Sequence, residues 1–600
     1  MSHEQDQSSG ASRSRSPSSS SSDSSSEHHV QAIAGSIRSR QRSSSSATAA
    51  APHLDRVYSG THLNDHSVYH SDNSVDSDDD DGPSESYPEE TEPVQEVRGG
   101  IVNERDIDLE KNQQSQELKK SKSARSARSR LDSKVVDWDG PDDPENPKNW
   151  PNKKKWAATV TVSLFTFISP VSSSMVAPAL SSIAADLHIT DEVLSQLTLS
   201  IFVLAYAVGP LILGPLSEIY GRVIVLQLAN LFFLVFNIGC AVSQTPAQMI
   251  VCRFFAGLGG SAPLAVGGGV LADCFRPEER GKSIAIYSLA PLLGPALGPI
   301  AGGFIAENTT WRWVFYATSI ADGLIQCMGL FFLRETYGPR LLKDRAKRLR
   351  KETGDDSYQT EAELQKKTLA QVLRGALIRP FRLLLTQPIV QCVACYMAYI
   401  YGIMYLVLST FPILWTSPEY YNESIGIGGL NYISLGLGFW AGSQICAPLN
   451  DRIYRRLKAQ NNHTGRPEFR VPLLGVGAVL IPAGLFIYGW TAQAHCHWIA
   501  PNIGAFLFGT GTIVSFQCMQ TYMVDTYTRF AASALAAGSF LRSLAGFGFP
   551  LFAPYMYQSL HYGWGNSVLA IIALVFGIPA PIFLWKYGQL LRKKSTYAAG

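Results

Sequence analysis

Apolar runs of about twenty residues recur along most of the chain, and each is long enough to cross a hydrocarbon bilayer as a helix. The runs begin at Trp156 and continue almost to the carboxyl end of the 600 residues. Because backbone polar groups must be satisfied within a segment that lies in lipid, we expect an all-α membrane protein. Twelve segments fit the length of a span: residues 156–179, 194–216, 223–243, 247–271, 283–305, 311–333, 389–414, 427–449, 471–490, 498–521, 531–555 and 565–587.

A charged stretch separates the sixth span from the seventh and divides the chain into two six-helix halves. The first residues are rich in serine and too poor in apolar side chains to offset the entropy of the chain, so we expect them to be disordered. The predicted segments are a Ser-rich cytosolic tail (1–130), a juxtamembrane segment (131–155), the first half (156–333), a cytosolic central loop (334–388), the second half (389–587) and a cytosolic tail (588–600).

The distribution of basic residues predicts the orientation. Lys and Arg concentrate in the loops on the side of the amino terminus, whereas Arg312 is the lone basic residue in the loops of the other side. Basic loops stay in the cytosol, so we expect both termini to be cytosolic in a multi-pass protein of the plasma membrane. Asn308 and Asn422 begin Asn-x-Ser/Thr sequences in outer loops and are candidates for glycosylation.

The loop between the second and third spans reads GPLSEIYGR, from Gly214 to Arg222. Gly214 is expected to let two helices approach closely, and Gly221 to supply a tight turn. Glu218 and Arg222 place opposite charges at a junction of helices, where their pairing would hold one conformation closed.

The fourth span carries Arg253, at the start of RFFAGLGGSAPLAVGGG. An arginine inside hydrocarbon is costly, so we expect it to face a cavity or a carboxylate partner. The alternative is that its long side chain reaches back to the outer surface of the membrane.

The fifth span reads GPALGPIAGG. Gly294, Gly298 and Gly302 recur every four residues and form a stripe without side chains, while Pro295 and Pro299 remove two backbone donors and bend the helix. A bent helix with a smooth face suits a moving contact between parts of a transporter. A merely close-packed helix is the alternative.

These motifs resemble those of the major facilitator superfamily, and the fifth span resembles the antiporter motif of its proton-coupled efflux members. Four further stretches are similar to the fungal drug:proton antiporters with twelve spans: DWDGPDDPENPKNWP (137–151), WRWVFY (311–316), RETYGPRLL (334–342) and FLRSLAGFGFPLFAPYMY (540–557). The resemblance implies that the chain is not an enzyme but a secondary exporter of drugs, fungicides or a toxic metabolite. It also implies that a proton gradient takes the place of a cofactor, and it associates Arg253 with proton coupling.

Two more charged residues lie inside predicted spans, Asp322 in the sixth and Arg542 in the eleventh. Ionisable groups in a membrane are costly and mark functional sites, so both join Arg253 as candidates for proton coupling. The alternative for Asp322 is a structural pairing with an arginine or a polar helix.

Candidate residues for the substrate cavity are Tyr206, Tyr396, Tyr399, Tyr405, Gln517 and Gln520. Aromatic faces with sparse hydrogen-bonding groups suit planar or amphiphilic organic ligands, although helix packing explains the same residues equally well. An acidic cage for a polycation is not evident, so polyamines rank below such drugs. A nutrient importer of the same fold and a non-transporting membrane receptor are the remaining alternatives.

The other expected partners follow from composition. The net charge of +2 argues against nucleic-acid binding, and no Walker sequence supports pumping driven by ATP. We expect a functional monomer that contacts membrane lipid and holds no metal. Cys392-x-x-Cys395 lies inside a span and is interpreted as packing, and the adjacent His495, Cys496 and His497 make a poor metal site.

Overall fold

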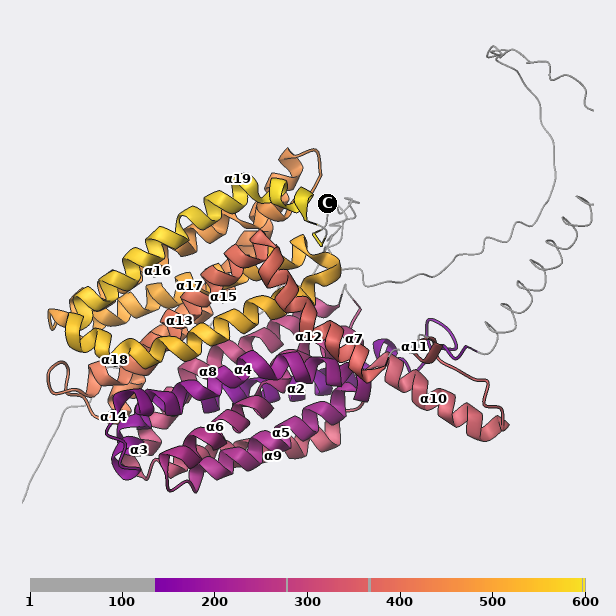
Figure 1. Ribbon diagram of the computed structural model, residues 1–600, viewed down its shortest axis with the longest axis horizontal. Helices are drawn as coiled ribbons and strands as arrows, with labels where there is room; N and C mark the ends of the chain where they lie inside the picture. Colours follow the sequence, from indigo (N-terminus) through magenta and orange to yellow (C-terminus); the bar gives the residue numbers. More distant parts are fainter. Residues whose placement is uncertain (1–134, 277–278, 365–367, 596, 599–600) are drawn as a thin grey trace, which may run out of the picture. The chain divides into compact units, whose positions relative to one another are not determined.

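The computed structural model describes residues 135–276, 279–364, 368–595 and 597–598, and it is helical (Figure 1). Within these ranges the only β-type pairing is an isolated bridge between Val135 and Gln359. The Ser-rich tail predicted over residues 1–130 lies outside the described residues. The all-α fold predicted from the sequence is confirmed.

Ten helical stretches of the described residues are long and apolar enough to cross a membrane. They are Asn152–Asp186, Glu192–Tyr220, Arg222–Ala241, Pro246–Cys274, Arg280–Asn308, Arg312–Phe332, Pro388–Thr416, Pro467–Gln493, Ile499–Thr526 and Ala531–Lys594. The last stretch contains two expected spans, because its backbone leaves helical geometry at His561, where φ is 53°. The eighth expected span corresponds to α14 (Ile425–Leu430) and α15 (Tyr432–Gln460), in which small and polar residues lower the hydropathy.

The first half packs together helices that follow one another in the chain and helices that are further apart. α2 packs against α8 and α9, α4 against α6, and α5 against α6 and α9. Their bounds are α2 Asn152–Ser174, α3 Leu180–Asp186, α4 Glu192–Tyr220, α5 Arg222–Ala241, α6 Pro246–Gly260, α7 Ala262–Cys274, α8 Arg280–Asn308 and α9 Arg312–Phe332.

The second half repeats this kind of packing, with α13 against α18, α16 against α17 and α18, and α15 against α17. Its remaining bounds are α13 Pro388–Thr416, α16 Pro472–Gln493, α17 Ile499–Thr526, α18 Ala531–Gly577 and α19 Pro579–Lys594. The two halves meet where α4 packs along α18 and where α8 packs against α14 and α15. α4, α13 and α18 therefore border the contact between the halves.

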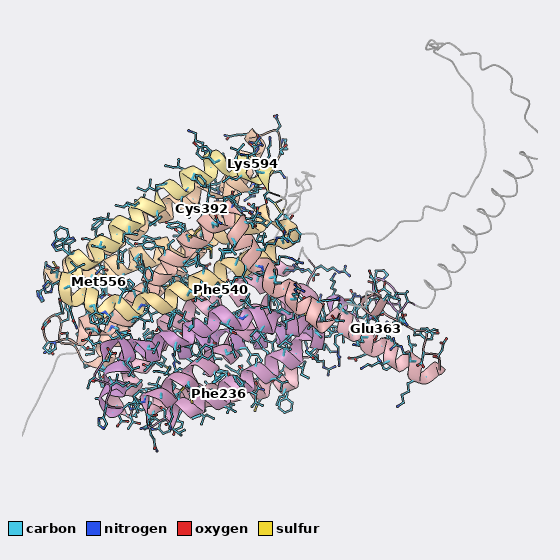
Figure 2. The ribbon with its side chains drawn as sticks, in the orientation of Figure 1. Phe236, Glu363, Cys392, Phe540, Met556 and Lys594 are labelled. Carbon is cyan, nitrogen blue, oxygen red and sulfur yellow. The ribbon has the colours of Figure 1, made fainter. Side chains whose placement is uncertain are left out.

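The central segment contains helices, although the sequence suggested only a loop. They are α10 Gly338–Thr353, α11 Glu361–Leu364 and α12 Leu369–Thr386. α12 packs on the second half, where Phe381 meets Phe540 of α18 edge-on with ring centres 4.9 Å apart. Phe540 is labelled in Figure 2. α10 and α14 lie at opposite ends of the helical bundle (Figure 1), which we call the α10 end and the α14 end.

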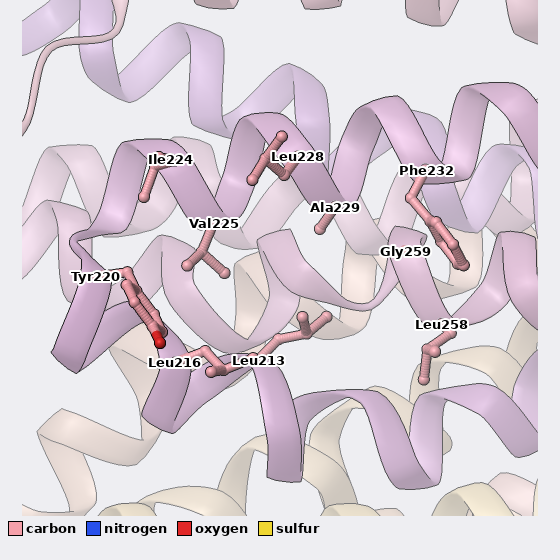
Figure 3. A pocket seen from close by; sticks show the side chains of 10 residues that line it. All are labelled: Leu213, Leu216, Tyr220, Ile224, Val225, Leu228, Ala229, Phe232, Leu258 and Gly259. Atoms are coloured by element: carbon pink, nitrogen blue, oxygen red, sulfur yellow. The ribbon is translucent and has the colours of Figure 1, made fainter. Parts of the chain in front are cut away.

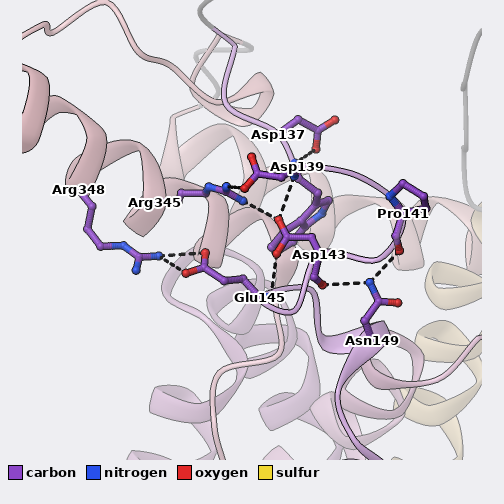
Figure 4. Close-up of polar contacts among 9 residues, drawn as sticks. Asp137, Asp139, Pro141, Asp143, Glu145, Asn149, Arg345 and Arg348 are labelled. Carbon is purple, nitrogen blue, oxygen red and sulfur yellow. Dashed lines mark hydrogen bonds and ion pairs between the residues drawn. The ribbon is translucent and has the colours of Figure 1, made fainter.

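A network that we call the juxtamembrane clamp fixes α10 to the segment before α2 (Figure 4). Arg345 of α10 pairs with Asp139 and, at 2.7 Å, with Asp143. Arg348 pairs with Glu145 at 3.0 Å. The carboxylate of Asp143 also accepts the N–H groups of Asp139 at 2.9 Å and Glu145 at 2.8 Å, so it holds its own loop and α10 at once.

We expect Arg345→Ala to release α10, seen as faster amide hydrogen exchange over 338–353 in the detergent-solubilised protein. Arg348→Ala is the control, because its pair with Glu145 is exposed and such pairs contribute little. The N–H of Asp139 and the guanidinium of Arg345 lower the pKa of Asp143. A lowered pKa means that the contact persists as pH falls toward about 4, the ordinary aspartate value, and is lost below it. Unchanged exchange in Arg345→Ala would show that the clamp does not hold α10.

Candidate functional site

Tyrosine and serine side chains meet where α2, α4 and α13 approach one another. The hydroxyl groups of Tyr206 and Ser169 lie 2.6 Å apart, which joins α4 to α2. The hydroxyl groups of Tyr405 and Ser173 lie 3.4 Å apart, which joins α13 to α2 across the contact between the halves. Both tyrosines are buried. The structure therefore places two of the predicted cavity residues together in the interior.

Tyr401 and Arg542 extend this group, which we call the central cluster: Tyr206, Tyr401, Tyr405 and Arg542. The rings of Tyr401 and Tyr405 have centres 5.0 Å apart, and the guanidinium of Arg542 lies 5.1 Å from the centre of the Tyr401 ring. Tyr401 was missed by the sequence reasoning. Its spacing of four residues from Tyr405 was the available signal, since residues so spaced share a helix face.

The other predicted cavity residues are dispersed. The hydroxyl of Tyr399 donates to the carbonyl of Leu569 in α18 at 2.5 Å, and Tyr396 is buried near Gly577. Both therefore face the second half itself. Gln517 donates to Ser443 of α15 at 3.0 Å, and Gln520 is exposed.

Arg253 lies fully buried inside the first half, which rules out in this structure the alternative that its side chain reaches the surface. Its guanidinium donates to three carbonyls, those of Thr198 (3.2 Å), Ser172 (3.1 Å) and Ser173 (3.3 Å). It also lies 4.5 Å from the ring centre of Phe202. The sequence predicted a cavity or a carboxylate beside Arg253, but its partners are backbone carbonyls of α2 and α4. Arg253 therefore connects these two helices.

Asp322 is fully buried between α9 and α5. Asn230 donates to one of its oxygens at 3.2 Å and to Gln326 at 2.8 Å, while the other oxygen of Asp322 has no hydrogen-bond partner among the described residues. The partner is thus a polar helix face and not an arginine. A buried carboxylate with one free oxygen is costly when charged, and such groups mark functional positions.

No hydrogen bond or ion pair between described residues joins Asp322 directly to Arg253. Polar side chains of α5 nevertheless contact the surroundings of each of them. Ser172 gives its carbonyl to Arg253 and donates its hydroxyl at 3.0 Å to Asn237. Asn237 lies two turns from Asn230 on α5, so one face of α5 connects the surroundings of both charges.

The glycine stripe of α8 is in close contact with α2. A Cβ at Gly294 would lie 2.5 Å from Cβ of Pro170, and at Gly298 it would lie 2.9 Å from the carbonyl of Val171 and collide with the hydroxyl of Ser174. Gly302 approaches α2 in the same way, and Pro295 and Pro299 are buried beside it. Side chains on the stripe would force the two helices apart.

The next face of α8 contacts the other half. A Cβ at Gly303 would lie 2.9 Å from the carbonyl of Ile425, and Gly426 donates its N–H to Glu307 at 2.7 Å. These contacts belong to the α14 end, where Gln558 also donates to Glu192 at 2.7 Å between the halves. The halves are therefore joined at this end.

Toward the α10 end, α8 is exposed on several faces. Ile284, Ala285, Ile286 and Ser288 are all exposed although they point in different directions around the helix. The ion pair between Lys155 and Glu279 at this end, at 3.3 Å, lies within the first half. The contacts of α8 with the second half are therefore at the α14 end, whereas at the α10 end α12 packs against both α4 and α18.

The loop motif departs from the expectation in two respects. Arg222 pairs with Asp273 of α7 at 3.3 Å, whereas Glu218 is exposed. Gly214 allows no close approach, because a Cβ there would meet nothing within 4 Å. Gly221 does make a turn, with φ 104°. The pairing predicted between Glu218 and Arg222 was wrong because a residue far along the chain supplies the carboxylate.

A second carboxylate closes this junction. Glu335, which follows α9, accepts the N–H of Arg222 at 2.9 Å and that of Val223 at 3.2 Å. A carboxylate at a helix N-terminus is stabilised by the unpaired N–H groups. The start of α5 is thereby fixed to the end of α9 by a residue that the sequence reasoning left without a role.

A separate groove of about 470 Å³ lies among α4, α5 and α6 (Figure 3). Its lining is apolar and offers a substrate no converging polar groups. The residues that line it are Leu213, Leu216, Tyr220, Ile224, Val225, Leu228, Ala229, Phe232, Leu258 and Gly259. Many of these side chains are exposed, so this groove belongs to the outer surface of the bundle and not to the contact between the halves.

The two candidate glycosylation residues are exposed at the α14 end. Asn308 is the last residue of α8, and its side chain donates to the carbonyl of Phe304 at 2.9 Å. Asn422 lies in the segment before α14 with φ 48°. Their exposure makes both accessible to modification, and their use stays a prediction.

The sequence profile of the Major Facilitator Superfamily matches residues 162–550. "Efflux pump vrtL" of Penicillium aethiopicum is 53% identical over 469 residues, which cover 78% of this chain and 92% of that protein. "Efflux pump radE" of Floropilus chiversii is 43% identical over 468 residues, which cover 78% and 86%. A solved structure of the xylose transporter XylE from E. coli aligns over 73% of this chain and 98% of that one, with a TM-score of 0.52 and 17% identity. That likeness concerns the fold.

Proposed function

Because the chain belongs to the major facilitator superfamily and is a multi-pass membrane transporter rather than an enzyme, we propose that it exports small organic compounds in exchange for protons. The observation that carries this proposal is the close contact between α8 and α2, the fifth and first spans. This contact is made by the stripe of Gly294, Gly298 and Gly302 on α8. The names of the relatives, which are efflux pumps, support the same direction of transport.

The proposed mechanism is alternating access, in which the two halves rock about a site between them. The structure, closed at the α14 end, represents one of the two required states. The opposite state must separate α8 from α14 and bring the α10 ends together. In this change α8 stays packed against α2 through the glycine stripe. The other face of α8 moves away from α14 and α15 of the second half.

The proton would move through the first half. Asp322 is buried with a free oxygen, and one face of α5 connects it to Ser172 and Arg253. Gain or loss of a proton at Asp322 changes the hydrogen bond with Asn230, and through α5 the position of α2. The first half thus contains a proton-carrying group next to the helix that borders the central cluster.

The proposed location is the plasma membrane, with both termini and the α10 end in the cytosol. The basic helices α10 and α12 lie at the end that this orientation places inside. The α14 end would then face outward with the exposed Asn308 and Asn422. In this orientation the halves are joined on the outer side, and the α10 end faces the cytosol, where an exporter takes up its substrate.

We expect cells that express the protein to accumulate several-fold less of a susceptible lipophilic fluorophore than cells without it, because export opposes passive entry. Collapse of the proton gradient with an uncoupler should restore accumulation. A panel of drugs, polyamines and metabolites identifies the substrate class in the same assay. Greater accumulation on expression would favour the nutrient importer. Equal accumulation across the panel would favour the receptor.

A further inference from the structure

Arg542 is the charged member of the central cluster, and no hydrogen bond from its guanidinium to another described residue is present. Its Nε lies buried without a partner, whereas the side chain as a whole is half-buried. We propose, building on the proposed export function, that Arg542 binds an acidic group of the substrate. The substrates are then planar aromatic compounds that carry a carboxylate or an acidic phenol.

The contrast with Arg253 supports this reading. Both arginines lie inside spans, yet Arg253 satisfies its donors on three backbone carbonyls and is completely buried. Arg253 therefore has a structural partner set, and Arg542 has none. A buried donor without a partner costs free energy, which an arriving acceptor would recover.

Arg542 forms no ion pair with a carboxylate of the described residues. Three buried or half-buried carboxylates of the spans have other partners: Asp322 contacts α5 in the other half, and Asp525 and Asp273 pair with Arg470 and Arg222. The charge that Arg542 brings to the central cluster is thus not neutralised by the protein. A cationic substrate such as a polyamine would meet an uncompensated positive charge there.

The neighbours of Arg542 supply aromatic faces. The ring of Tyr401 lies 5.1 Å from the guanidinium of Arg542. Its centre is 5.9 Å from that of the Phe516 ring and 5.0 Å from that of the Tyr405 ring. Such rings bind planar ligands by stacking, and Gly546 keeps α18 close to Tyr401, since a Cβ there would lie 2.8 Å from the ring.

The geometry of the guanidinium selects the acid. A planar fork of N–H donors matches a carboxylate with two parallel hydrogen bonds. A neutral ester of the same ring system keeps the stacking contacts but cannot supply the charged acceptor pair. The proposal therefore predicts a difference between an acid and its ester.

The test measures binding to the purified full-length protein in detergent, by fluorescence titration with anthracene carboxylic acid, two other polycyclic aromatic acids and their methyl esters. The unaltered protein should bind an acid about tenfold or more tightly than its ester. Arg542→Gln should remove that preference by weakening the acid alone. Arg542→Lys should retain part of it, since the charge remains.

Lys586→Gln is the matched control, because Lys586 of α19 is a cation remote from the central cluster, beside Tyr587. It should bind acids and esters as the unaltered protein does. An unaltered protein that binds esters as tightly as acids, or binds neither, overturns the proposal even if Arg542→Gln fails to fold. Equal loss of acid and ester in Arg542→Gln also overturns it and indicates a structural role.

The proposed export function is tested separately. Efflux of a neutral lipophilic compound by the unaltered protein and by Lys586→Gln measures export without any change at Arg542. When neutral compounds are exported but acids show no dependence on Arg542, the inference about substrate class fails and the exporter stands. When no compound is exported by the unaltered protein, the proposed function fails.

Discussion

Gly298→Leu is expected to reduce export at least about tenfold while the protein still inserts into the membrane, because the helix contact on which transport depends cannot form. In the structure a Cβ at Gly298 already collides with the hydroxyl of Ser174 and would lie 3.2 Å from the backbone nitrogen of Met175. Three further carbon atoms have no space unless α8 moves away from α2. The measurement is efflux per molecule of protein at the cell surface.

Gly268→Leu provides the control for this substitution. Gly268 lies in α7 of the same half, and a Cβ there would meet nothing within 4 Å, so leucine should be tolerated and flux retained. Normal transport by a correctly inserted Gly298→Leu protein would show that the stripe serves packing alone. Loss of flux in both variants would point to a general effect of bulk.

Asp322→Asn should abolish uphill export, with a loss of about tenfold or more, while downhill exchange of substrate survives. The substitution keeps the shape and the contact with Asn230 but cannot gain or lose a proton. It also removes a buried charge without a counter-ion, so the protein should remain as abundant as before. The measurement is flux per inserted molecule, both down and against a substrate gradient. Loss of uphill flux with retained downhill flux shows that coupling to protons is lost while transport remains.

The control for Asp322→Asn is Asp186→Asn. Asp186 pairs with Arg312 at the α14 end and is half-exposed, so its charge contributes little and both kinds of flux should be unchanged. Uphill export at the normal rate in Asp322→Asn would remove Asp322 from the mechanism and leave Arg253 as the remaining candidate of that half. Lower abundance without uncoupling would assign Asp322 a structural role.

Hydropathy predicted the spans because a bilayer imposes one length and one chemistry on each of them. It was least informative for the eighth span, where small and polar residues such as Gly442 and Ser443 contact Thr510 and Gln517 of α17. The central helices α10 and α12 escaped the same criterion, since they are amphipathic and rich in charge. Their stability comes from the juxtamembrane clamp and from contacts with α18.

Side-chain partners were harder to predict than the helices that carry them. Arg222 and Asp273 are separated by 51 positions, and which carboxylate reaches the arginine depends on how α5 and α7 pack. The same difficulty applies to the tyrosines of α13. Tyr399 contacts α18, whereas Tyr401 and Tyr405 lie in the central cluster, and the sequence did not distinguish these neighbours. Periodicity defines the faces of a helix but not the neighbour that each face will meet.

The most direct test of the account uses the purified protein in sealed liposomes with an imposed pH gradient and a fluorescent substrate on one side. Proton-coupled export predicts that substrate moves uphill against the flow of protons, and that a dye reporting internal pH registers proton movement only when substrate is present. Substrate that moves in the same direction as protons, or accumulates equally without a gradient, would contradict proton-coupled export by this chain.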